Sequence, residues 1–324
     1  MNKFKMKSIF MILIMGFILI ILGTKSQAAD FSKDTGCNNS DTSFKYDVKG
    51  YNGNNTAIQI TANNKDTAKV IYKYSNLKPR EFYSISAYVK VDNIICDSND
   101  YQSGAIIGLE QTPASTEMIK QSTDWKKISY VALSSVDGTL NAKFSLNNSS
   151  GTVLFDCIEI KQINEDSDFK VYSYTNGRKK TGRVVFWNDS IKGTGITDEE
   201  MKKWLGTLLD IREYLTGLTS VEVDDGNVDI IATNEYGAVA YINWGRTEIQ
   251  WMKSSVNLDD FHRDFQNSVD TPYFITHEIG HQHTLSQVNF ATEFWGTALG
   301  LIADYNLNLK ISNLGNMTLQ KESI

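Results

Sequence analysis

Cysteine is scarce in this chain, which has only Cys37, Cys96 and Cys157 among its 324 residues. The number is odd and no pair has the C-x-x-C spacing, so the cysteines do not indicate a thiolate zinc site. In an exported chain one disulfide is allowed, and Cys37 with Cys157 is the preferred pair because both lie at the ends of the first domain. Three buried free thiols are equally compatible with the sequence.

Proline and glycine are also few, with 3 and 22 residues, which excludes collagen-like and low-complexity chains. The formal net charge is −6, and loss of residues 1–28 removes four lysines and no acidic residue, which leaves −10. A surface of this sign argues against nucleic acid and anionic membranes as partners.

A long apolar run stands at the N-terminus. It covers residues 8–23, follows the basic Lys3, Lys5 and Lys7, and precedes the small residues Ser26 and Ala28. This pattern predicts a signal peptide over residues 1–28, and hence a secreted or cell-surface-associated protein with no stable membrane span after cleavage. The alternative is an uncleaved anchor, although the run falls short of the ~20 residues that span a bilayer.

The length predicts two domains. Residues 29–163 show period-two alternation, for example at Tyr83, Ile85, Ala87, Val89 and Val91, with turn-prone stretches between the runs and no long helical pattern. This predicts a β-sandwich. Residues 78–90, 123–130 and 154–160 resemble strands of carbohydrate-binding-module-like jelly rolls, a resemblance that implies this fold and allows glycan binding.

Four aromatic residues of this domain are candidates for stacking on sugars: Tyr51, Tyr72, Tyr101 and Trp125. Aromatic residues in a sandwich are also common in the core, so both roles stay open.

Residues 164–168 are polar and acidic, and predict a linker after which the period changes. In residues 164–324, a hairpin turn at Asn176-Gly177, a capping box at Thr197 and a helix that ends at Gly217 are followed by strands near 228–232, 238–242 and 248–252. Helices are expected over 258–265, 272–285 and 290–307, with a capped start at Asp270-Thr271-Pro272. This order predicts an α+β domain, and we expect residues 29–163 to fold independently of it.

The segment His277-Glu278-Ile279-Gly280-His281 holds two of only four histidines. Residues four apart share one helix face, so both imidazoles can bind one Zn²⁺. Glu278 beside them can act as the general base for water, and Gly280 leaves room for another element.

A zinc site of this kind needs a third protein ligand. Glu293, early on the next helix, is the first choice, and Asp304 is the second choice or a partner of the ligands. His283 faces the other side of the helix, and His262 belongs to an earlier one. The oxyanion stabiliser stays open among Tyr236, Tyr241 and Tyr305.

His277 to His281 followed by Glu293 resembles the gluzincins, and the short gap with a sandwich in front looks most like the enhancin-like, mucin-degrading metallopeptidases. The resemblance implies a zincin-like domain and a secreted endopeptidase with one catalytic Zn²⁺ that cleaves glycoproteins such as mucins. Two alternatives stay open. One is a carbohydrate-binding or adhesive surface protein with a non-catalytic zinc domain, and the other is a cell-wall peptide amidase.

Overall fold

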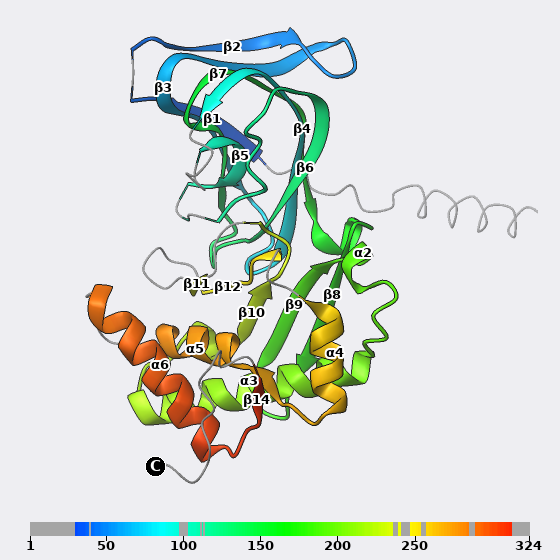
Figure 1. Ribbon diagram of the computed structural model, residues 1–324, viewed down its shortest axis with the longest axis vertical. Helices are drawn as coiled ribbons and strands as arrows, with labels where there is room; N and C mark the ends of the chain where they lie inside the picture. Colours follow the sequence, from blue (N-terminus) through cyan, green and yellow to red (C-terminus); the bar gives the residue numbers. More distant parts are fainter. Residues whose placement is uncertain are drawn as a thin grey trace, which may run out of the picture.

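The computed structural model describes residues 30–38, 40–96, 103–110, 112, 114–235, 239–240, 247–253, 257–284 and 289–312. The expected signal peptide at 1–28 lies outside these ranges, as do Tyr101, Tyr236 and Tyr241. The described chain forms an all-β part followed by a part that mixes strands and helices (Figure 1). Within the described ranges, no helix is long and apolar enough to cross a membrane.

The first part is one antiparallel sheet of seven strands. These are β1 (Asp30–Gly36), β2 (Thr42–Lys49), β3 (Asn55–Ser75), β4 (Phe82–Cys96), β5 (Gly104–Leu109), β6 (Thr123–Leu133) and β7 (Leu140–Gln162). Their order is β1-β3-β7-β4-β6, with β2 paired to β3 and β5 paired to β7. Because alternate side chains of a strand point to opposite faces, the period-two residues of β4 are buried, which confirms the pattern that predicted the strand.

Two long strands bend and take part in both layers of this part. The first half of β3, near Ile58, pairs with the end of β7 near Phe155, whereas its second half, near Tyr72, pairs with the start of β7. Register shifts between Ala62 and Ala68 mark the bend. The sheet thereby folds over itself into the two-layered sandwich that the sequence predicted.

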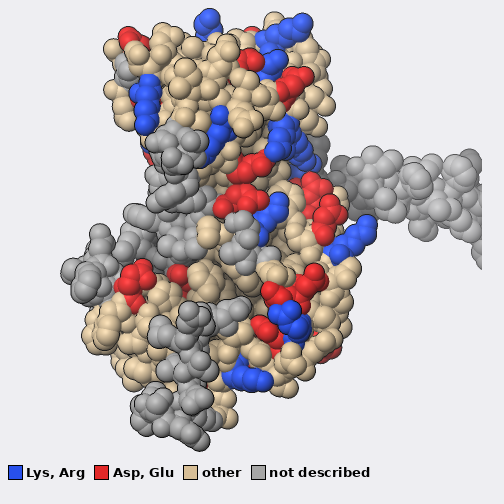
Figure 2. Space-filling view, in the orientation of Figure 1, with Lys and Arg blue, Asp and Glu red and all other residues tan. Residues whose placement is uncertain are grey.

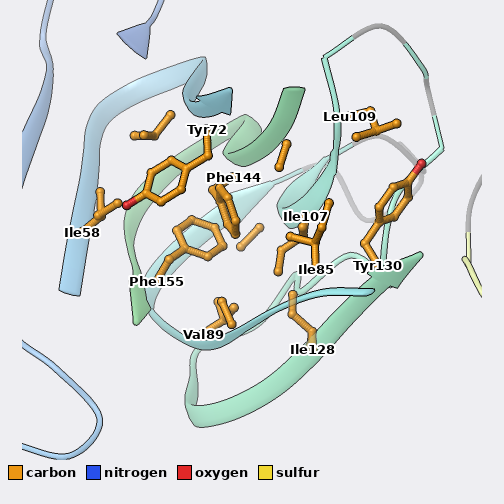
Figure 3. Close-up of a cluster of buried hydrophobic side chains, with 14 of the residues drawn as sticks. Ile58, Tyr72, Ile85, Val89, Ile107, Leu109, Ile128, Tyr130, Phe144 and Phe155 are labelled. Carbon is orange, nitrogen blue, oxygen red and sulfur yellow. The ribbon is translucent and has the colours of Figure 1, made fainter. Parts of the chain in front are cut away.

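The sandwich core is apolar and rich in aromatic rings (Figure 3). Phe144 contacts Tyr72 and Phe155 edge to face, with ring centroids 5.3 Å and 5.5 Å apart. Such pairs contribute about 0.5–1.5 kcal/mol each beyond the burial of their area. Tyr72, one of the candidates for sugar stacking, is therefore a core residue.

The second part contains a five-stranded mixed sheet and helices. Its elements are η1 (Ile163–Glu165), β8 (Phe169–Thr175), β9 (Thr181–Trp187), α2 (Asn188–Ile191), α3 (Asp198–Thr219), η2 (Asp224–Gly226), β10 (Val228–Ile231), β11 (Val239–Ala240), β12 (Ile249–Gln250), α4 (Leu258–Gln266), β13 (Thr271–Pro272), α5 (Tyr273–Gln282), α6 (Asn289–Asn306) and β14 (Ile311–Ser312). The strand order is β11-β12-β10-β9-β8, and β13 pairs with β14 separately. β9, β10 and β12 run parallel, while β8 and β11 are antiparallel to their neighbours.

Helix α3 packs its apolar side against this sheet. The capping box is present as the sequence predicted, because Thr197 accepts from the Glu200 amide and the Glu200 carboxylate accepts from the Thr197 amide. The expected end at Gly217 is wrong, since the helix continues to Thr219 and stops at Ser220, whose φ is 58°. An interior glycine costs a helix only about 1 kcal/mol, which the packing of Leu215 and its neighbours outweighs.

The expected start of α5 also differs. Pro272 is the residue before the helix, no side chain caps it, and Thr271 and Pro272 pair with β14 instead. The Asp270 carboxylate accepts from the backbone amide of Lys310 at 2.9 Å, so it ties the end of the described chain to the start of this helix.

The two parts share a buried apolar cluster. Phe82, Val131, Leu133 and Ile163 from the sandwich side pack with Phe169, Val185 and Ile231 of the second part. The expected linker at 164–168 begins at this cluster, and Asp166 within it accepts a 2.6 Å hydrogen bond from Ser84 Oγ. The parts therefore meet over an apolar interface of the kind found inside domains.

On the face shown in Figure 2, Lys and Arg are interspersed with Asp and Glu rather than gathered into a field of one sign.

Cys37, Cys96 and Cys157 are all free. The expected Cys37–Cys157 bond is therefore absent, and the alternative of three buried thiols is wrong because Cys37 and Cys157 are exposed.

Candidate functional site

Helices α5 and α6 pack against each other at very short range. A Cβ added at Gly280 would meet the carbonyl oxygen of Gly296 far inside contact distance, and one at Gly300 would lie 3.2 Å from the Cα of His277. The prediction that Gly280 leaves room for another element is thus confirmed. The two helices run antiparallel, so the start of α6 lies beside the end of α5.

This packing brings three candidate ligands together. The Nε2 atoms of His277 and His281 are 2.9 Å apart. Oε2 of Glu293 lies 3.4 Å from the first and 3.5 Å from the second. The circle through these three atoms has a radius of about 1.9 Å, slightly less than the ~2.0–2.2 Å bonds that zinc forms to nitrogen and carboxylate oxygen, so one ion can reach all three. The donor set therefore fits a single zinc ion.

Glu278 lies beside this triangle on α5. Its side chain is buried, and one of its carboxylate oxygens lies within 4.8 Å of a nitrogen of each histidine. A carboxylate so close to the ligands, on the next residue of the helix, is placed to exchange a proton with a molecule bound between them. The structure thus places Glu278 near the candidate ligands, while Oε2 of Glu293 is the third atom of the triangle.

Thr297 is a site residue that the sequence reasoning missed. Its Oγ1 lies 3.2 Å from Nδ1 of His277. If Nδ1–H donates to this hydroxyl, the lone pair of Nε2 is left for a metal. The sequence contains a signal for this role, because Thr297 is four residues after Glu293 and hence on the same helix face.

The electrostatics of His277 suit a metal ligand. Burial, and then the neighbouring His281, lower the pKa of His277 below its usual 6.5. The ring is therefore neutral at pH 7, which is the form that binds metal.

Asp304 occupies a different position from the one expected of a ligand. Its Oδ2 accepts from Thr276 Oγ1 at 3.0 Å, and Oδ1 has no hydrogen-bond partner within the described part of the chain. Burial raises the pKa of Asp304 to about 7. Thr276 is the residue before His277, so Asp304 joins α6 to α5 by a hydrogen bond.

His283 and His262 have other hydrogen-bond partners and are not part of the triangle. Nδ1 of His283 lies 3.4 Å from Thr219 Oγ1 at the end of α3, and burial, with the charge of Arg212, lowers the pKa of His283 to about 3. Nε2 of His262 lies 2.9 Å from Gln266 Nε2 on α4. Tyr305, the remaining oxyanion candidate within the described ranges, is exposed on α6.

A separate aromatic cluster lies on the sandwich. Tyr51 stacks on Tyr88 with ring centroids 3.8 Å apart, and Trp125 stands edge to face with Tyr51 at 6.1 Å. Tyr51 is 42% exposed, and a hydrogen bond with Tyr88 raises its pKa. Asp156 fixes the backbone at Tyr51, because its carboxylate accepts a hydrogen bond from the Tyr51 amide at 2.8 Å. Two of the four candidates, Tyr51 and Trp125, thus meet in one partly exposed cluster.

No protein-family model matches the chain, and no curated protein matches it. Among solved structures, the chain is similar to a CBM61 carbohydrate-binding module in complex with β-1,4-galactotriose, with 9% identity, a TM-score of 0.28, and 44% of this chain and 93% of that chain covered.

Two further structures show likenesses of the same size. The family 11 carbohydrate-binding module of a cellulosomal cellulase from Clostridium thermocellum aligns with 15% identity, a TM-score of 0.25, and coverage of 43% and 91%. The enzymatically active domain of tailspike protein 4 from bacteriophage CBA120 aligns with 8% identity and a TM-score of 0.28, over 41% of this chain and 19% of that chain. Likenesses this low carry no argument about what the chain binds, so the sandwich assignment rests on the strand pairing itself.

Proposed function

We propose that this chain is a zinc-dependent endopeptidase whose metal ligands are His277, His281 and Glu293 and whose general base is Glu278. The observation that carries the proposal is the triangle of Nε2, Nε2 and Oε2 atoms, with sides of 2.9, 3.4 and 3.5 Å and a buried carboxylate beside it. A purely structural zinc site has four protein ligands and needs no such carboxylate.

The residues have distinct roles in peptide hydrolysis. When bound, zinc supplies Lewis acidity that makes water a competent nucleophile at neutral pH. Glu278 accepts one proton from the water molecule as the water oxygen bonds to the carbonyl carbon of the substrate. The carbon–nitrogen bond then breaks, and Glu278 delivers the proton to the leaving nitrogen, so charge and atoms balance. Thr297 holds His277 in the tautomer that this arrangement needs.

The sheet offers a place for an extended substrate. β11 is one of the two edge strands of the five-stranded sheet, as far as the described residues go, and α5 packs against it. A peptide that adds to this edge as a further strand would pass beside the ligands on α5. An edge strand that contacts the helix carrying both histidines favours a peptide substrate over a small molecule.

The substrate class we propose is secreted or surface glycoprotein such as mucin, in line with an exported protein and with the family resemblance of the ligand spacing. Cell-wall peptides are the competing substrates, since an amidase would use the same residues. Mucin and purified cell-wall peptides, offered to one preparation, separate the two.

The test uses residues 29–324, with metal content measured by mass spectrometry and hydrolysis followed on casein and mucin. We expect about one zinc per chain, activity lost to chelator and restored by zinc, and turnover lower by about 10²-fold or more in Glu278→Gln despite full zinc. Leu218→Ala, a change at a half-exposed position on α3 that has no proposed role in the site, is the control. A metal-free preparation that does not take up added zinc would overturn the proposal.

A second role, glycan binding by the sandwich, is favoured by the Tyr51–Tyr88–Trp125 cluster. Rings held in place and partly exposed stack on the apolar face of a pyranose, and the rigid pair loses little entropy on binding. Titration of mucin oligosaccharides should give binding that Trp125→Ala abolishes. Tyr46→Ala is the matched control, because Tyr46 is 40% exposed on β2 and outside the cluster. Equal binding by both variants would exclude the cluster as the site.

A further inference from the structure

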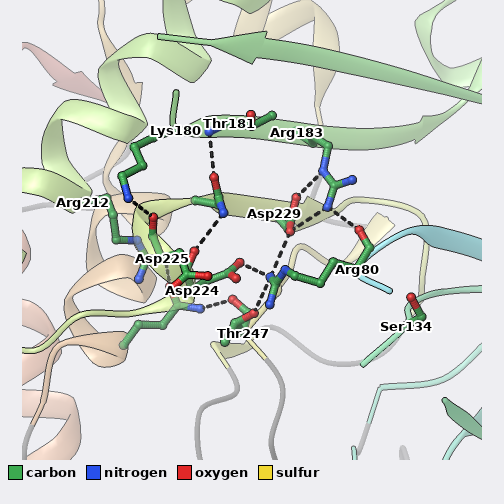
Figure 4. A network of polar contacts seen from close by, with 12 residues as sticks. Arg80, Ser134, Lys180, Thr181, Arg183, Arg212, Asp224, Asp225, Asp229 and Thr247 are labelled. Carbon is green, nitrogen blue, oxygen red and sulfur yellow. Dashed lines mark hydrogen bonds and ion pairs between the residues drawn. The ribbon is translucent and has the colours of Figure 1, made fainter. Parts of the chain in front are cut away.

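A partly buried polar network joins the sandwich to the second part (Figure 4). Arg80, in the turn before β4, forms ion pairs with Asp224 and with Asp229, the latter at 3.5 Å. Arg183 on β9 holds the same Asp229 with two hydrogen bonds of 2.7 and 3.0 Å, and also donates to the carbonyl oxygen of Arg80 at 2.8 Å. The two aspartates are almost fully buried, so their charges depend on these arginines.

Arg80 also reaches the segment that leads into β12. Its Nη2 donates to Thr247 Oγ1 at 3.1 Å. The carbonyl oxygen of the same Thr247 accepts a 2.6 Å hydrogen bond from Nε2 of Gln282. Arg80 and Gln282 therefore hold one residue from two sides, although they lie in different parts of the protein.

Gln282 is the last residue of α5 and directly follows His281. It is fully buried, and its amide is fixed at both ends, since Oε1 accepts from Arg212 on α3 while Nε2 donates to Thr247. A side chain anchored in this way sets the rotation of the last helical turn about its axis. That turn carries His281, whose ring must point at the ion within a few tenths of an ångström.

We propose that the sandwich positions the metal-binding histidines through the contacts Arg80–Thr247–Gln282, which makes Arg80 a positioning residue for the site. This inference rests on the proposed zinc site. The polar contacts of the Arg80 side chain and carbonyl oxygen within the described residues are with Asp224, Asp229, Thr247 and Arg183, and not with the histidines. Its effect comes through the backbone of Thr247 and the side chain of Gln282, and the sandwich is thus part of the catalytic unit.

The first experiment measures zinc affinity by competition with a chromophoric chelator in the full chain. We expect Arg80→Ala and Thr247→Val each to weaken binding by roughly 10-fold, as loss of a group that orients a ligand does. The double variant should weaken binding by about the same factor, because both changes break one chain of contacts. Multiplied effects in the double variant would show separate roles and overturn the proposal.

The second experiment does not depend on zinc. Hydrogen exchange of the metal-free protein should speed up at the last turn of α5, where the His283 amide donates to Gly280 O at 3.0 Å, in Arg80→Ala and Thr247→Val. Val131→Ala, which alters the shared apolar cluster without touching these contacts, should leave that turn unchanged. If wild type binds no zinc, the proposed function fails, and the exchange data alone decide this inference.

Because Arg80→Ala leaves buried aspartates with less compensation, it could fail to fold. Gln282→Glu then replaces it, since the carboxylate keeps the contact with Arg212 but cannot donate to the Thr247 carbonyl. Wild-type exchange and affinity in both Thr247→Val and Gln282→Glu would overturn the proposal.

Discussion

Gly296 offers a sharp test of the proposed metal site. A Cβ added there would lie 2.7 Å from Nδ1, 2.8 Å from Cε1 and 2.9 Å from Cγ of His281. Ordinary contact begins near 3.4 Å, so Gly296→Ala forces the imidazole away by about 0.7 Å. Ligand distances in a working site vary by only about ±0.2 Å. The substitution should therefore weaken zinc binding by about 10- to 100-fold.

The effect on stability separates this cause from unfolding. Alanine favours a helix over glycine by about 1 kcal/mol, which offsets part of an overpacking cost of about 1–3 kcal/mol. The metal-free variant should therefore unfold within a few degrees of wild type. Gly217→Ala on α3 is the control, because nothing lies within 4 Å of its added Cβ, and it should be slightly more stable with unchanged zinc affinity. Zinc bound by Gly296→Ala as tightly as by wild type would refute the reasoning.

Four further outcomes are expected. His277→Ala should lose zinc and activity together, whereas Glu278→Gln should keep zinc, measured by mass spectrometry, and lose about 10²-fold or more in turnover. Glu293→Ala should weaken zinc affinity strongly and Asp304→Asn less, by chelator competition, with the reverse order excluding Glu293 as a ligand. Thr297→Val should lower zinc affinity about 10-fold while Thr297→Ser restores it. Burial raises the pKa of Asp304 to about 7, so the folded protein keeps this carboxyl protonated at a pH where the unfolded chain has lost the proton. The stabilisation that the protonated carboxyl gives is therefore complete below pH 4 and is lost as the pH rises to 7. Asp304→Asn should then gain stability over wild type between pH 4 and 7, by up to about 4 kcal/mol in urea unfolding of the metal-free protein, and a constant difference across that range would contradict the assignment.

What could be predicted from the sequence was local. Period-two alternation identified the strands of the sandwich, and the capping residue Thr197 identified the start of α3. The spacing of His277 and His281 gave the two imidazoles, because residues four apart meet whatever surrounds the helix. Glu293 was chosen for its distance along the chain, and the structure places it at the triangle.

The remaining features depend on contacts between distant segments. Thr297 and Gly296 acquire roles only when α6 packs on α5, and Arg80 only when the sandwich meets residues near 224–247. The local pattern also gave a wrong end for α3, because tertiary packing extends the helix beyond Gly217 to Thr219. The exposed Cys37 and Cys157 were misjudged because the sequence does not show which strand ends meet.

The bent strands of the sandwich have a kinetic consequence. Because β3 and β7 each belong to both layers, neither layer can close without the other, and contacts such as that between Ile58 and Phe155 join residues distant in sequence. Loop-closure entropy must be overcome before such contacts form, so all-β parts of this kind fold in milliseconds to seconds, more slowly than helices joined by short loops. We therefore expect the α5–α6 pair to form faster than the sandwich.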